Sequence, residues 1–257
     1  MTIVAGIALA VALYGWGLVR VARARRRFPR WAPVAFALGL AAIAAALLGP
    51  LDDLSDAFLS WHMLQHLVLV GVAAPLLLLG APLRLALAAL PKQTATALSG
   101  ALASPAVRIV THPAFAWFQF AFVLYAAHFS PLYEAALENE SVHAFEHVLF
   151  LTSGIVFWTP LLAVAPVPHA PPHAVRLLAI FMAIPMSAFL GFTFYVERHV
   201  LYPHYALRPG AVADQMNAGA VMWIAGGVPL FVALLCVVAD WAARERRSDP
   251  LYGGAGA

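Results

Sequence analysis

Four histidines form two pairs whose spacing suits metal binding: His62 with His66, and His143 with His147. Residues four apart on an α-helix lie on one face with Cβ atoms about 5–6 Å apart, so each pair would present two imidazole rings one above the other. Neutral imidazole is the commonest metal ligand in proteins. Two such helices side by side would bring four imidazoles to one level, and we therefore predict a transition-metal site.

The kind of metal depends on the other ligand types in the chain. The only cysteine, Cys236, lies in an apolar run, which excludes a disulfide framework and a CxxC redox motif. Imidazole suits copper, zinc, iron and nickel, whereas thioether favours Cu(I). His128, at the end of another apolar run, is a fifth candidate imidazole. Further candidates, as ligands or as groups that orient an imidazole, are Met63, Glu146, Asp214 and Met216.

Other chemistries use the same residue types. Residues 143–147 read HAFEH, which matches the HxxEH pattern of inverted zincin proteases, with Glu146 as general base. HxxxH pairs are also typical of membrane di-iron oxygenases, and two spans that each supply a histidine could hold a haem. A membrane metalloenzyme that uses this cluster is therefore the alternative to a protein that only binds and transfers metal.

Composition indicates where these histidines lie. The chain has 257 residues, of which 63% are hydrophobic and 11% are charged, against about 45–50% and 25% in soluble domains. The surplus apolar surface must face lipid, which excludes a soluble enzyme, a disordered tail and a nucleic-acid-binding module. A crossing takes about 20 apolar residues. Seven apolar runs approach that length, at residues 3–19, 32–48, 58–79, 114–129, 142–164, 175–196 and 212–238.

We predict an all-α, polytopic membrane protein with a bundle of about seven transmembrane helices, because no segment shows the alternation of a transmembrane strand. Residues 84–110 are too polar to span the bilayer and too apolar for a plain linker, so we predict an interfacial segment there. Residues 1–243 would form a single transmembrane domain. Residues 244–257 would form a short cytoplasmic tail.

The basic residues predict the orientation of the bundle. Thirteen of the fifteen lysines and arginines fall in the first, third and fifth connections and after the last span. Basic loops stay on the cytoplasmic side, so we expect the N-terminus outside and the C-terminus inside. Both histidine pairs and His128 then lie towards the outer face.

Several sequence blocks, taken together and in order, resemble the CtaG-type cytochrome c oxidase assembly factors. The resemblance covers roughly residues 30–240, with departures at Ala127 and at Met216-Asn217. The blocks are WHMLQH at 61–66, APL at 74–76, GAP at 80–82, HFSPLY at 128–133, HAFEH at 143–147, FWTP at 157–160, DQ at 214–215 and MW at 222–223.

The resemblance implies a multi-pass protein of the bacterial plasma (inner) membrane that is not an enzyme and that acts as a copper chaperone. It would deliver copper to the binuclear centre of a haem–copper oxidase, whose copper is held by imidazoles below the outer surface. Its partners would be the oxidase catalytic subunit and the lipid bilayer. An upstream copper donor and a homo-oligomer stay open. We expect His62, His66, His143 and His147 to be the primary ligands, with His128 as an additional or exchanging ligand and Glu146 or Asp214 behind them.

Overall fold

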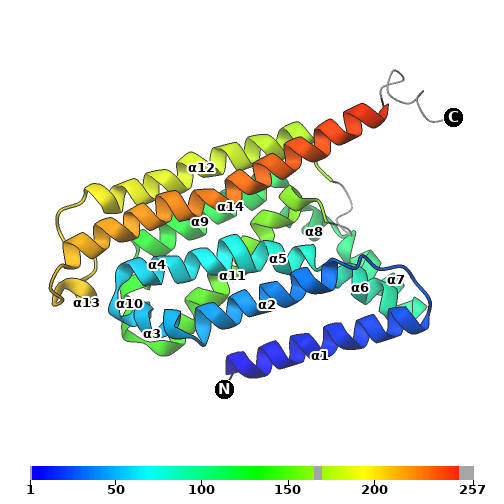
Figure 1. Cartoon of the computed structure of the whole chain (residues 1–257), viewed down its shortest axis with the longest axis horizontal. Coiled ribbons are helices and arrows are strands. Elements are labelled where there is room, and N and C mark those ends of the chain that lie inside the picture. The colour runs from blue at the N-terminus through cyan, green and yellow to red at the C-terminus, as the bar shows by residue number, and fades with distance from the viewer. Residues whose placement is uncertain (1, 165–169, 249–257) are drawn as a thin grey trace.

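The computed structural model describes residues 2–164 and 170–248, and every regular element in these ranges is helical (Figure 1). The predicted all-α fold is therefore confirmed. Each of the seven apolar runs forms helix, and the long helices lie roughly along one axis as a bundle. The six longest are α1 (Thr2–Arg23), α2 (Ala32–Leu47), α9 (Pro113–Phe129), α11 (Glu140–Leu162), α12 (His173–Val196) and α14 (Ala211–Ser248).

Five helical segments of the described chain are long and apolar enough to cross a membrane. Two further runs are bent: α2 continues into α3 (Pro50–Ala57) at 42°, and α9 into α10 (Leu132–Glu138) at 62°. If each bent pair is one span, the total is seven, as the sequence predicts.

The third apolar run changes helix type directly below the first histidine pair. It consists of α4 (Leu59–Val68), the π-helical turn η1 (Leu69–Ala73) and α5 (Ala74–Leu79). In the π register the Val70 carbonyl would pair with residue 75, but Pro75 has no N–H to donate. The Trp158 indole N–H, on α11, donates to that carbonyl instead at 2.8 Å. A neighbouring helix thus satisfies the group that proline frees, as membrane helices require.

Helices α12 and α14 pack side by side along most of their length (Figure 1). Gly191 and Gly219 face each other at the contact, and a Cβ atom added to Gly191 would lie 2.6 Å from the Gly219 carbonyl oxygen. Small residues let membrane helices approach to backbone contact. This pair forms one wall of the bundle, and α14 also packs on α4.

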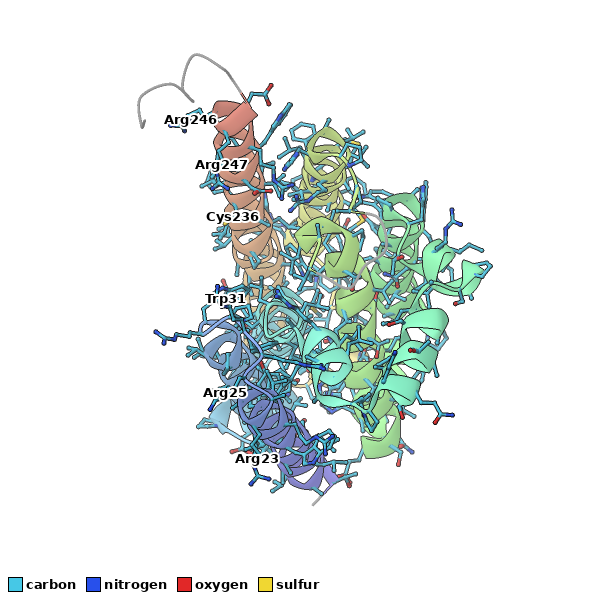
Figure 2. The ribbon with its side chains drawn as sticks, turned by 90° about the vertical axis from the view of Figure 1, so that its right-hand side faces the viewer. Arg23, Arg25, Trp31, Cys236, Arg246 and Arg247 are labelled. Carbon is cyan, nitrogen blue, oxygen red and sulfur yellow. The ribbon has the colours of Figure 1, made fainter. Side chains whose placement is uncertain are left out.

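Basic residues gather at one end of the bundle. Arg23 ends α1 and Arg246 and Arg247 lie in the last turn of α14, and both helices end on the same side of Figure 1, which is the side that faces the viewer in Figure 2. The predicted interfacial segment is at the same end and folds as α6 (Pro82–Ala89), α7 (Lys92–Leu102) and α8 (Pro105–Val110). The short helices α3, α10 and α13 (Pro203–Ala206) lie at the opposite end.

Helix α14 continues to Ser248, so the first residues of the predicted tail belong to the last helix. Arg244 pairs with Asp240 one turn earlier at 3.1 Å, and Arg246 and Arg247 occupy the last turn, where positive charge stabilises a helix C-terminus. Residues 249–257 of that tail lie outside the described residues.

Candidate metal centre

The two histidine pairs lie on the first turns of two helices that begin at the same end of the bundle. His62 and His66 are on α4, and His143 and His147 are on α11. Helix α11 begins after Asn139, whose side-chain oxygen accepts from the Ser141 N–H at 2.9 Å and so caps the first turn. Within each pair the ring centroids are 4.4 and 4.2 Å apart.

Three of these histidines and one glutamate bring ligand atoms together. One ligand atom from each of His62, His66, His143 and Glu146 lies within 4.8 Å of the others. The two Nε2 atoms of His62 and His66 are 3.1 Å apart, and each lies 3.8 Å from Glu146 Oε2. The side chains of His62 and Glu146 are completely buried. We call these four residues the His/Glu group.

The His/Glu group fits a bound transition ion. A tetrahedral ion with metal–nitrogen bonds of 2.0–2.1 Å holds two ligand nitrogens about 3.3 Å apart, close to the observed His62–His66 spacing. Buried polar atoms without partners are costly, and a metal ion would satisfy several here at once. Among the described residues, the atoms of this group that are buried without a hydrogen-bond partner are His66 Nδ1, His143 Nε2 and both carboxylate oxygens of Glu146.

Tyr205 contacts the Nδ1 atom of His62, the ring nitrogen that does not face His66. Burial raises the pKa of the Tyr205 hydroxyl above its usual range, so the hydroxyl keeps its proton. That proton is donated to the Ser55 carbonyl at 2.9 Å. The Tyr205 oxygen therefore accepts from His62 Nδ1–H at 3.3 Å. This leaves the lone pair on His62 Nε2, the nitrogen that faces His66 and Glu146.

Gln65 anchors one ring nitrogen of His147, as Tyr205 does for His62. Its amide N–H groups donate to the Ala46 carbonyl at 2.9 Å and to Asp52 at 2.8 Å. Gln65 Oε1 then accepts from His147 Nε2–H at 3.1 Å. His147 is thus anchored beside the His/Glu group, with its ring centroid 5.6 Å from that of His66.

His128 is buried apart from the His/Glu group. Its Nδ1–H donates to the Leu124 carbonyl at 2.7 Å, while Nε2 is buried without a partner among the described residues. The ring stacks on Tyr133 and meets Phe150 edge-on, at centroid distances of 5.7 and 5.9 Å.

Three other candidates have their own contacts. Both Asp214 oxygens turn to the start of α4, where they accept from the Leu59 N–H at 2.6 Å and the Ser60 hydroxyl at 2.5 Å, so Asp214 positions the helix rather than an imidazole. Met216 Sδ accepts from Arg198 at 3.2 Å. Met63 is buried in an apolar cluster that also contains Met222.

The sequence prediction did not include Gln65 or Tyr205. Gln65 is a fully buried amide within an apolar run, and that polarity is a signal the sequence contains. Tyr205 lies in a polar connection 143 positions from His62, and nothing in the sequence relates the two residues.

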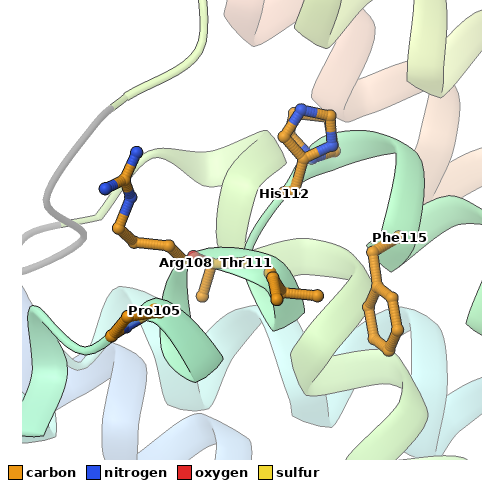
Figure 3. A pocket seen from close by; sticks show the side chains of 7 residues that line it. Pro105, Arg108, Thr111, His112 and Phe115 are labelled. Carbon is orange, nitrogen blue, oxygen red and sulfur yellow. The ribbon is translucent and has the colours of Figure 1, made fainter.

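At the basic end of the bundle, polar side chains line an open hollow and do not form a buried group. A hollow of about 480 Å³ opens where α8 meets α9, with Arg108, His112 and Phe115 on its walls (Figure 3). His112 Nδ1 accepts from the Ala114 N–H at 3.3 Å, so His112 caps α9, in agreement with its place before Pro113 at the start of an apolar run. These walls are exposed to solvent and resemble no metal site.

The chain was also compared with known protein families. Residues 12–244 match the model of the cytochrome c oxidase caa3 assembly factor family, Caa3_CtaG. The chain belongs to this family. The resemblance in the ordered sequence blocks is thereby confirmed.

Relatives of this Caa3_CtaG chain include two uncharacterised mycobacterial proteins. One, from Mycobacterium leprae, is 28% identical over 255 residues, which cover 91% of this chain and 38% of the relative. The other, from Mycobacterium bovis, is 28% identical over 261 residues, which cover 95% of this chain and 39% of the relative. The chain thus spans less than half the length of these relatives. No solved structure matches it.

Proposed function

We propose that this assembly factor binds copper in the His/Glu group and delivers it to the binuclear centre of a haem–copper oxidase in the bacterial plasma membrane. The observation that carries the proposal is the convergence of His62, His66, His143 and Glu146 within 4.8 Å of one another. Their buried, unpartnered atoms support a bound ion. Family membership supports the oxidase as the recipient.

Copper suits this set of ligands and this task. Among divalent first-row metals, copper binds nitrogen and oxygen sites most tightly. For Cu(I) a carboxylate is a poor ligand, so Glu146 would keep the group from trapping the monovalent ion. Transfer between two imidazole sites, one ligand at a time, would avoid exposing a bare ion to hydrocarbon.

The position of the His/Glu group along the bundle supports the same recipient. The group lies at the end opposite the arginine-rich connections. By the positive-inside rule, we expect the group to lie towards the outer face and both the arginines and the C-terminus to lie in the cytoplasm. If the oxidase copper lies below the outer surface, as the family resemblance implies, the two proteins could exchange an ion within the membrane.

Delivery can be tested in cells that make the oxidase. In cells that carry the His62→Ala/His66→Ala variant, the purified oxidase should lose most of its binuclear copper and its activity, because the donor site is gone. His173→Ala is the matched control, since His173 pairs with Asp240 at the other end of the bundle. A fully copper-loaded oxidase in cells with the double variant would contradict the proposal.

A metalloenzyme remains the second candidate because Glu146 lies inside the group, as an HxxEH protease would place its general base. Stoichiometric zinc or iron in the protein as purified, together with turnover of a peptide or lipid, would favour it. The cavity that adjoins His66 has a volume of only about 50 Å³, which favours an ion over an organic substrate.

A further inference from the structure

A small cavity lies inside the bundle, next to the His/Glu group. It has a volume of about 50 Å³ and is bounded by α4, η1, α9, α11, α12 and α14. A cavity needs about 10–15 Å³ to hold one water molecule, so this one accepts an ion or a few waters. Among the residues on its wall are Met63, His66, His128 and Met222.

His128 is prepared to bind a metal ion. Its Nδ1–H is committed to the Leu124 carbonyl, which places the lone pair on Nε2. Metal-binding histidines typically donate their second nitrogen to a carbonyl or carboxylate in this way. The Nε2 atom is buried and has no partner within the described residues, although the His128 side chain is on the cavity wall. An apolar cavity alone would leave that lone pair unsatisfied.

Two thioethers share the cavity with His128. Met63 on α4 and Met222 on α14 are 1% and 4% exposed, and both are on the wall. Imidazole with thioether ligands selects Cu(I) over harder divalent ions. This set therefore differs in softness from the His/Glu group, where a carboxylate joins the imidazoles.

His66 belongs both to the His/Glu group and to the cavity wall. It is one of the four residues of the His/Glu group and also lies on the cavity wall. Phe150 packs against both rings, with centroids 4.4 Å from His66 and 5.9 Å from His128. An ion bound to His66 is therefore one aromatic ring away from His128.

We propose that His128, Met63 and Met222 form a second, soft metal site that takes Cu(I) from the His/Glu group by way of His66. The proposal rests on the proposed function, since it presumes that copper reaches the His/Glu group. The ion enters and leaves as Cu(I), so no electron is transferred and no co-reactant is required.

The test uses the full chain in detergent under anaerobic conditions. Met63→Leu/Met222→Leu removes both sulfur atoms and nearly conserves side-chain volume, which cores tolerate. Titration with Cu(I) against a chromogenic Cu(I) chelator should show about two ions per chain in the parent protein and about one in the double variant. Met186→Leu is the control, because Met186 is buried in the core of α12 and is not on the cavity wall.

X-ray absorption at the copper edge tests the same site without a variant. The Cu(I)-loaded parent should show sulfur scatterers, and the double variant only nitrogen and oxygen. Copper bound without sulfur in the parent, or equal Cu(I) stoichiometry in all three proteins, would overturn the second site and leave the His/Glu group standing. A parent chain that binds no copper in either redox state would overturn the proposed function as well.

Discussion

Each of three imidazoles is anchored through one ring nitrogen. His62 donates to Tyr205, His147 to Gln65 and His128 to the Leu124 carbonyl. Groups that fix the tautomer and orientation of a ligand matter for affinity, and their loss typically costs 10–100-fold in metal binding. We therefore expect metal affinity to depend on groups that would not themselves contact the ion.

Replacing Tyr205 tests this anchoring. Tyr205→Phe removes the oxygen that accepts from His62 Nδ1–H, so the ring can rotate or change tautomer. We expect copper affinity to fall about 10–100-fold, as measured by competition with a chelator, while helix content stays unchanged. Tyr195→Phe, on the exposed face of α12, should keep the parent affinity. Equal affinities in the two variants would show that Tyr205 does not position the ligand.

Much of the site can be predicted from spacing, and the rest depends on contacts between distant segments. The i,i+4 pairs place His62 near His66, and His143 near His147, without knowledge of the fold. Spacing cannot tell which imidazoles meet across two helices. For this reason Glu146, predicted to lie behind the ligands, is found in the His/Glu group, and His128 lies apart.

At the scale of elements, the start of α4 is determined by a residue from α14. Asp214 accepts from the Leu59 N–H and the Ser60 hydroxyl, 155 positions away in the sequence. This contact satisfies a free N–H at the first turn of the helix that carries His62, and it joins α4 to α14. Asp214 therefore joins the start of α4 to α14 at the histidine end of the bundle.

We expect Asp214→Ala to lower the free energy of unfolding by about 1 kcal/mol, the usual value of a lost helix cap. The thermal midpoint in detergent should fall, and copper should still bind once the protein is folded. Asp53→Ala, at an exposed position on α3, is the control and should leave the midpoint near that of the parent. A thermal midpoint unchanged by Asp214→Ala would show that Asp214 does not cap α4.

The helices themselves are readily predicted, because about 20 apolar residues in a row leave few alternatives to a membrane helix. The bends are harder to predict. Residues 50–57 form a separate helix at 42° to α2, and η1 interrupts the third run. The sequence indicates that Pro75 can be tolerated but not that Trp158, 88 positions away from Val70, satisfies the freed carbonyl.

At the scale of the whole molecule, the basic residues and the histidine pairs lie at opposite ends of the bundle. The arginine-rich first connection and the end of α14 are at one end of the bundle, and the histidine pairs are at the other. Because basic residues near membrane helices remain cytoplasmic, this separation predicts that the metal site faces outwards.

Cysteine labelling tests that orientation directly. In a Cys236→Ser background, Glu138→Cys lies at the last residue of α10 at the histidine end, and Arg27→Cys lies in the first connection, both at exposed positions. A membrane-impermeant maleimide should label Glu138→Cys in intact spheroplasts and Arg27→Cys only after lysis. The reverse pattern would place the His/Glu group on the cytoplasmic side, away from the oxidase copper.

Binding of copper by imidazoles of the His/Glu group is the central step of the proposed function, and electron paramagnetic resonance of the Cu(II)-loaded, purified protein measures it directly. We predict a signal of about one Cu(II) per chain with splitting from nitrogen ligands. It should be lost in His62→Ala/His66→Ala and retained in His173→Ala and Met63→Leu/Met222→Leu. A nitrogen-split signal that persists in the His62→Ala/His66→Ala variant, or no such signal in the parent, would contradict the account.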